Sequence, residues 1–483
     1  MLFHTFNFAV FFLVSFLVYW SLPTNRARKV FLILGSYAFY ASWDWRFLGL
    51  LLISTAIDWI AGARIHAATT RQVQRAWMLF SVVTNLGILG YFKYCNFFIE
   101  SAADLLSFLG FEPHLSTLRI ILPVGISFYT FQTLTYSLDI FFGRLKPTKS
   151  LLDFAFFVAF FPQLVAGPIM RAHDFLPQAE EKRRWSQVDL RPCLIFFLIG
   201  FFKKACVSDL LAPYVDEYFG ASSLVVSMGG TGGPGPATFD HFSAWIAMIY
   251  GVVQFYCDFS GYSDMAIGAA GLLGYQLCLN FQHPYFATSV GNFWRRWHIS
   301  FTSFLRDYVY YPLGGARGTS TRLAVNLLVT WAIAGLWHGA AWTFVTWGFL
   351  SGVFLVVHAL QRQFLRRRRR KEGAFAVLSI ALTLFLFGVT GFLFRGLSMA
   401  DAWHGVLAVF WIGEPGPNRV GGQHLLLPVL LLYLGHYASY RGWGERVWRR
   451  LPGWAFATAY GAMFAASIVF METNNTPFIY FQW

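Results

Sequence analysis

Charged side chains are scarce in this chain. Asp, Glu, Lys and Arg together make up 12% of its 483 residues, whereas apolar residues make up 57% and aromatic residues alone 20%. A soluble domain of average composition is about 25% charged. The shortage of charge excludes a soluble globular protein of this length and indicates a polytopic membrane protein, whose first partner is the lipid bilayer.

Acidic residues and cysteines are scarcer still. The chain carries 23 Asp and Glu against 37 Lys and Arg, a net charge of +14, and only five cysteines. The basic residues stand in short clusters between apolar runs, as in loops at anionic headgroups, so nucleic acid is not an expected partner. The cysteines stand singly without a C-x-x-C pair, so neither a disulfide framework nor a zinc site is expected. We expect no bound metal and no bound cofactor.

Long apolar runs fill most of the sequence. We expect an all-α polytopic membrane protein with about eleven to thirteen transmembrane and re-entrant helices, forming a single integral-membrane domain over residues 1–483. The first run lacks a basic n-region and an A-x-A cleavage site, so we interpret it as a retained helix. The expected spans are residues 1–22, 30–56, 77–99, 119–142, 151–166, 192–211, 242–257, 262–279, 323–347, 348–361, 374–396, 424–440 and 454–471.

Polar segments between these runs are short. The sequence S-M-G-G-T-G-G-P-G-P near 227–236 predicts a flexible linker, and the run of arginines near 362–371 predicts a basic cytoplasmic loop. No Lys or Arg precedes Arg26, which favours an external N-terminus, and the last twelve residues, also without Lys or Arg, favour an external C-terminus.

The first chemistry-bearing segment runs from Asn292 to Gly315 and contains W-R-R-W-H-I-S around His298. If this segment is one helix, Arg295 lies close to the face that carries His298. An interfacial amphipathic helix anchored by its aromatic and arginine side chains is the plainer interpretation. For His298 itself we favour function, because imidazole titrates near neutral pH and is costly to place in apolar surroundings.

The second segment is A-G-L-W-H-G-A-A-W around His338, and no charged residue occurs from Leu323 to Val357. A lone buried histidine is more often a hydrogen-bonded core residue than a catalyst. The small residues Gly335 and Gly339, however, leave room for a ligand. Together, the two segments favour a membrane-embedded proton-transfer site.

These segments resemble the signature of the membrane-bound O-acyltransferase superfamily, in particular its bacterial alginate and peptidoglycan O-acetyltransferase branch. Further matches are M-L-F-H-T-F-N-F at the start, F-F-P-Q-L-V-A-G-P-I-M-R ending at Arg171, Y-C-D-F-S-G-Y-S-D-M-A-I-G ending at Gly268, and N-T-P-F-I-Y-F-Q-W at the end. The resemblance implies a ring of tilted helices around a central funnel. It also implies that His338 and His298 are the catalytic histidines.

Acyl transfer from a thioester to a hydroxyl fits two embedded histidines. His338 would take the hydroxyl proton. The oxyanion donor stays open between His298, the indole of Trp337 or Trp342, and backbone N–H groups near Gly339. Asn292, Arg295, Asp258 and Asp264 are further candidates for lining the tunnel. Similar terminal F-x-Y-F motifs in the family branch make Tyr480 a candidate acyl relay.

The two aspartates of this set stand inside an apolar run, where an unpaired carboxylate costs about 2.5–3.5 kcal/mol at a helix centre. We expect Asp258 and Asp264 to face the funnel or to pair with an arginine such as Arg295 or Arg306. Lys203 and Lys204 are expected to extend to the cytoplasmic headgroups, and contact with donor phosphates is the alternative.

The resemblance implies a multi-pass protein of the bacterial inner membrane. It would move an acyl group, by analogy acetyl, from acetyl-CoA or an acyl carrier protein to an extracytoplasmic polysaccharide of the alginate, cellulose or peptidoglycan type. A periplasmic SGNH-type transferase would be the partner. The alternatives are a polysaccharide or lipid-linked glycan transporter or flippase, and a non-catalytic scaffold of a polymer synthase.

Overall fold

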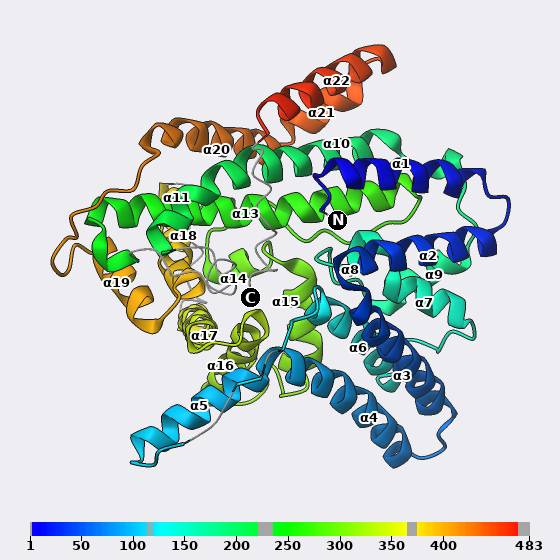
Figure 1. Ribbon diagram of the computed structural model, residues 1–483, viewed down its shortest axis with the longest axis horizontal. Coiled ribbons are helices and arrows are strands. Elements are labelled where there is room, and N and C mark those ends of the chain that lie inside the picture. Colours follow the sequence, from blue (N-terminus) through cyan, green and yellow to red (C-terminus); the bar gives the residue numbers. More distant parts are fainter. Residues whose placement is uncertain (1, 114–116, 119, 221–234, 365–373, 472–483) are drawn as a thin grey trace. The chain divides into compact units, whose positions relative to one another are not determined.

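A computed structural model describes residues 2–113, 117–118, 120–220, 235–364 and 374–471 of the chain (Figure 1). Within these ranges the regular elements are helices, and one isolated bridge joins Phe239 to Asn418. The expectation of an all-α protein is confirmed. The chain divides into two compact units, residues 1–197 with 265–278 and residues 198–264 with 279–483.

The first unit begins with helices whose N-termini are capped by threonine. The side chains of Thr5, Thr24 and Thr70 each accept a hydrogen bond from a backbone N–H in the first turn of the helix that follows. The elements up to the unit boundary are α1 (Phe6–Ser21), α2 (Asn25–Asp44), η1 (Trp45–Phe47), α3 (Leu48–Ala67), α4 (Arg71–Leu89), η2 (Gly90–Tyr94), α5 (Cys95–Phe108), α6 (Ile126–Phe141), α7 (Leu151–Ala159), α8 (Phe161–Leu164), α9 (Ala172–Glu180), η3 (Trp185–Gln187) and α10 (Leu190–Phe201), which continues into the second unit.

A buried carboxylate ties three helices of this unit together. Asp58 of α3 accepts hydrogen bonds from Ser81 and Asn85 of α4 and from Ser137 of α6. These four buried polar side chains thereby each make at least one hydrogen bond, as burial requires. The three helices pack against one another, as Figure 1 shows.

The second unit carries both histidine segments. After α13 it contains the helical hairpin α16–α17, which packs against α18 (Figure 1). Its elements are η4 (Phe202–Ser208), α11 (Asp209–Phe219), η5 (Pro236–Thr238), α13 (His241–Leu272), η6 (Pro284–Phe286), α14 (Val290–Trp294), α15 (Ile299–Leu305), η7 (Arg306–Tyr310), α16 (Ser320–His338), α17 (Trp342–Phe364), α18 (Ala374–Arg395), α19 (Met399–Val409), η8 (Gln423–Leu425), α20 (Leu426–Tyr440), α21 (Trp443–Arg450) and α22 (Gly453–Val469). The end of α13, residues 265–272, belongs to the first unit.

Two of the predicted helix boundaries that differ from the structure affect the candidate site. The expected separate spans 242–257 and 262–279 belong to one helix, α13, and Asp258, which lies between them, pairs with Lys204 rather than breaking the helix. The expected boundary at 347–348 lies instead at 339–341, between α16 and α17. His338 is therefore the last residue of a helix and not the middle of one.

Among the described residues, five helices are long and apolar enough to cross a membrane: Asn25–Ala67, Arg71–Phe108, His241–Leu272, Trp342–Gln363 and Phe375–Arg395. Phe6–Ser21 and Gly453–Val469 are shorter apolar helices. These are the helices of a multi-pass membrane protein, while the ring, the funnel and the full count of spans stay predictions. Most of the predicted linker 227–236 and of the basic loop 362–371, and Tyr480, lie outside the described residues.

Candidate active site

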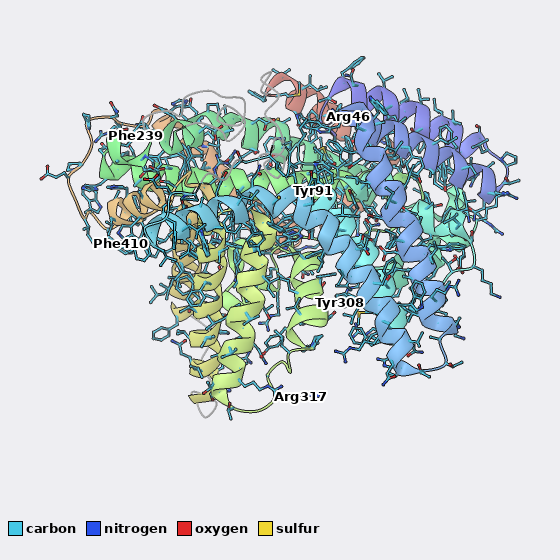
Figure 2. The ribbon with its side chains drawn as sticks, turned by 60° about the horizontal axis from the view of Figure 1, so that its bottom comes forward. Arg46, Tyr91, Phe239, Tyr308, Arg317 and Phe410 are labelled. Atoms are coloured by element: carbon cyan, nitrogen blue, oxygen red, sulfur yellow. The ribbon has the colours of Figure 1, made fainter. Side chains whose placement is uncertain are left out.

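The α16–α17 hairpin determines where His338 lies. α16 has 19 residues, so its two ends are about 27 Å apart. Figure 2 shows Arg317 beside the end at which α16 begins, and His338 closes the opposite end. The two helices can approach closely because Gly335 and Gly348 have no side chain. A methyl group added at Gly335 would come within 2.2 Å of the Phe344 carbonyl oxygen, and one added at Gly348 within 2.2 Å of the Trp331 carbonyl oxygen.

His298 lies at a break between two short helices. It precedes α15 with left-handed backbone angles, φ 45° and ψ 52°, which cost about 1–3 kcal/mol for a non-glycine residue. Two backbone hydrogen bonds hold this conformation on either side: Gln282 N–H donates to the Arg296 carbonyl and Ile299 N–H donates to the Asn280 carbonyl, each at 2.9 Å. The segment is therefore not one helix, and the condition under which Arg295 would share a helix face with His298 is not met.

Both imidazole rings are enclosed by aromatic side chains. The rings of His298 and His338 lie 6.3 Å apart between centroids, and the residues are 1% and 5% exposed. Phe301 and Trp337 each contact both imidazoles, at centroid distances of 4.9–5.9 Å. The rings of Phe301 and Trp337 are 4.2 Å apart. The enclosure is completed by Phe259 beside His298 and by Trp347 and Phe394 beside His338.

We call these seven residues the histidine cage. Its walls are apolar, and its two imidazoles are the groups in it that can exchange a proton near neutral pH. A small reacting group placed between the two rings would contact both of them. The cage is therefore suited to proton transfer in surroundings from which bulk water is largely removed.

One polar contact of the cage was missed by sequence reasoning. Asn280 is buried, and its Oδ1 lies 3.2 Å from Nδ1 of His298. The same oxygen accepts hydrogen bonds from the hydroxyl of Ser300 at 2.9 Å and from its backbone N–H at 3.4 Å. A lone asparagine just after an apolar run carries no signal in the sequence, because its importance depends on the chain turning back onto residues 298–300.

The two aspartates of α13 do not pair with the arginines that we expected. Asp258 pairs with Lys204 at 2.6 Å and Asp264 with Lys203 at 2.7 Å, and Lys204 also contacts Asp209 at 2.8 Å. Instead of extending outward, both lysines of the π-helical turn η4 end at these carboxylates, and Lys204 is buried. The two aspartates therefore fasten η4 to α13 beside the cage.

The remaining candidates lie outside the cage. Arg295 is exposed, and the Asn292 carboxamide accepts a hydrogen bond from Arg296 at 3.2 Å. Arg306 pairs with its neighbour Asp307 at 2.7 Å. Trp342, at the start of α17, is 56% exposed, so of the two expected indoles the structure brings Trp337 to the histidines.

Comparison with protein families identifies one match. The profile of MBOAT, the membrane-bound O-acyltransferase family, matches residues 143–394, a range that includes both histidines of the cage and Asn280.

Comparison with characterised proteins gives three informative relatives. The chain is 38% identical to the protein named probable alginate O-acetylase of Azotobacter vinelandii, over 86% of this chain and 79% of the relative. It is 34% identical to the peptidoglycan O-acetyltransferase of Helicobacter pylori, over 71% and 68% respectively. It is 25% identical to the teichoic acid D-alanyltransferase of Streptococcus thermophilus, over 52% and 60%.

Proposed function

The chain belongs to the membrane-bound O-acyltransferase family, and from this premise we propose that it transfers an acetyl group from a cytoplasmic thioester toward an extracytoplasmic polysaccharide. The histidine cage is the proposed reaction site. The observation that carries this proposal is the pair of buried imidazoles, 6.3 Å apart in an aromatic enclosure within the matched region. Family membership favours this enzyme over the transporter and the scaffold.

We assign the general base to His338. It is the C-terminal residue of α16, where the partial negative charge of the helix end stabilises an imidazolium by about 0.3–1 kcal/mol. His298 stands at the opposite kind of position, before the first turn of α15. In the proposed step the acceptor hydroxyl oxygen attacks the thioester carbonyl carbon while His338 takes the hydroxyl proton. The C–S bond then breaks, and the proton passes from His338 to the departing thiolate.

The oxyanion of this step needs hydrogen-bond donors. The backbone N–H of Gly339 already donates to the Gly335 carbonyl at 3.3 Å, so it is a poor choice. The backbone N–H groups of Phe344 and Val345, in the first turn of α17, likewise already donate to the Ala341 carbonyl, at 3.1 Å and 3.3 Å. The donor that we propose is therefore the indole N–H of Trp337, whose ring contacts both imidazoles.

Acetyl is the proposed acyl group, and an alginate- or peptidoglycan-like polymer is the proposed acceptor. The support is that identity is 38% and 34% to relatives named for O-acetyl transfer and 25% to one named for D-alanyl transfer. Acetyl-CoA or an acyl carrier protein would supply the thioester. We further propose that Tyr480 carries the group to a periplasmic SGNH-type partner, and that the protein resides in the bacterial inner membrane.

Polymer acetylation in cells tests the function. In a strain that lacks its own member of the family, we expect the wild-type chain to restore O-acetyl groups on the exported polymer, and His338→Ala and His298→Ala to leave them near background. His241→Ala, which removes a buried histidine that contacts Trp411 outside the cage, is the matched control and should behave as wild type. Unchanged acetylation by His338→Ala would refute the base assignment, and lost polymer export would favour a transporter.

A further inference from the structure

The amide of Asn280 has a defined orientation. Its Oδ1 faces the backbone N–H of Ser300, a group that can only donate, so the atom at this position is the carbonyl oxygen and not the NH₂ group. The amide nitrogen, on the other side, donates to the hydroxyl of Ser263 at 3.1 Å. Both ends of the Asn280 amide are thus fixed by residues other than His298, namely Ser300 and Ser263.

This orientation determines the tautomer of His298. Nδ1 of the ring faces the same Oδ1 at 3.2 Å, and a carbonyl oxygen has no proton to give. Nδ1 must therefore carry the proton of the neutral ring. The other nitrogen, Nε2, is then left with a lone pair, because a neutral imidazole has one N–H and one acceptor nitrogen.

The backbone supports the same arrangement. The Asn280 carbonyl accepts a hydrogen bond from Ile299 N–H at 2.9 Å, so Asn280 contacts both the main chain beside His298 and the ring of His298. Because His298 has left-handed backbone angles, its ring direction depends on these contacts rather than on a regular helix. A residue that holds both the conformation and the tautomer acts through His298 and need not touch the substrate.

We infer that Asn280 is a positioning residue that holds His298 as the Nδ1–H tautomer and commits Nε2 to accepting a proton or a hydrogen bond during acyl transfer. Neutral His298 then cannot donate an N–H from Nε2 to the oxyanion, so that task belongs to other donors. The inference rests on the proposed function, because it gives His298 a part in that reaction. It also restricts the roles that the two histidines can have in the reaction, since both present a lone pair, and not an N–H group, to the reacting groups.

The tautomer can be observed directly. The chain has 12 histidines, so full-length protein labelled with ¹⁵N-histidine in lipid nanodiscs is compared with the His298→Gln variant to assign the His298 ring nitrogens. At a pH where the ring is neutral, we expect Nδ1 to carry the proton in wild type. In Asn280→Leu, we expect both tautomers to be populated. A protonated Nε2 in wild type, or an unchanged tautomer in Asn280→Leu, would overturn the inference.

Activity separates positioning from folding. Asn280→Leu should lower kcat on the order of 10²-fold, the lower range for acid–base catalysis, with KM nearly unchanged. Asn280→Asp, which keeps an acceptor oxygen, should recover a large part of this loss. Asn326→Leu is the matched control, because this buried asparagine donates to the Gly315 carbonyl at 2.9 Å and its kcat should stay at the wild-type value.

The outcomes distinguish this inference from the proposed function. If His298→Ala works at the wild-type rate, the role of His298 in the proposed function fails. If His298→Ala is inactive while Asn280→Leu keeps the wild-type kcat and tautomer, the positioning role of Asn280 alone fails. If Asn280→Leu does not fold, Asn280→Asp still decides, because it must show the Nδ1–H tautomer and measurable kcat.

Discussion

Replacing Gly339 by alanine tests whether the packing directly behind the histidine cage is as tight as the structure indicates. A methyl group at this position would lie 2.1 Å from a ring carbon of Phe344, far inside van der Waals contact. The backbone angles of Gly339, φ −159° and ψ 150°, suit any residue, so the clash with the ring is the whole effect. Phe344 must move, and it packs on Phe394, which contacts the His338 ring at 5.2 Å.

Overpacking of this kind costs about 1–3 kcal/mol. Since the displaced ring transmits the change to His338 through one neighbour, we expect Gly339→Ala to lower both the stability of the protein and its acetyl-transfer rate. In the Phe344→Leu background, where the clashing ring is absent, the added methyl group should cost much less. The two changes should therefore be strongly non-additive.

Thermal unfolding in detergent and acetyl transfer in nanodiscs measure the two effects. Gly391→Ala is the control, because a methyl group there meets nothing within 4 Å and alanine is favoured over glycine inside a helix. A stability of Gly339→Ala within about 0.5 kcal/mol of wild type would refute the reasoning, since that is the range of neutral surface changes. So would an equal penalty in the Phe344→Leu background.

Three further changes test other parts of the account. Lys204→Met leaves two buried carboxylates without their shared cation and should cost about 3–5 kcal/mol, measured as lost yield of monodisperse protein, and a normal yield would contradict the pairing. Tyr480→Phe should abolish polymer acetylation if the tyrosine relays the group, and full activity without an acylated C-terminal peptide in wild type would exclude the relay. Burial alone would raise the pKa of Asp240, but hydrogen bonds, including one from Arg419, hold this pKa below its usual range. Its contribution to stability is therefore present above about pH 4 and lost as the pH falls through the lowered pKa, so Asp240→Asn should lose less stability on acidification than wild type, which unfolding between pH 6 and 3 measures.

Composition and motif alone predict the helical membrane fold and both histidines. The long apolar runs predict helices, because a transmembrane helix needs about 20 consecutive apolar residues and pairs its backbone groups within its own segment. His338 stands out because an imidazole in 35 residues without charge is costly unless it is used. Such signals are local, so one sequence is sufficient to find them.

The contacts around the histidines could not be predicted in the same way. Asn280 meets His298 only because the chain turns back between residues 282 and 296. Pro284 indicates a break there, but the local pattern does not say which residues the turn brings together. Asp258 was expected to pair with arginine, but the π-helical turn directs Lys204 to it instead. Helix periodicity describes one element at a time, and these pairings depend on three-dimensional packing.

The central claim is that His298 and His338 act as one catalytic unit inside the cage. The most direct test is the initial rate of acetyl transfer by nanodisc-embedded protein for His298→Ala, His338→Ala and the double variant, with the thioester donor saturating. Residues that act as a unit show grossly non-additive losses. We predict that the double variant is no slower than the slower single variant. Losses that multiply, or a wild-type rate in either single variant, would contradict the claim.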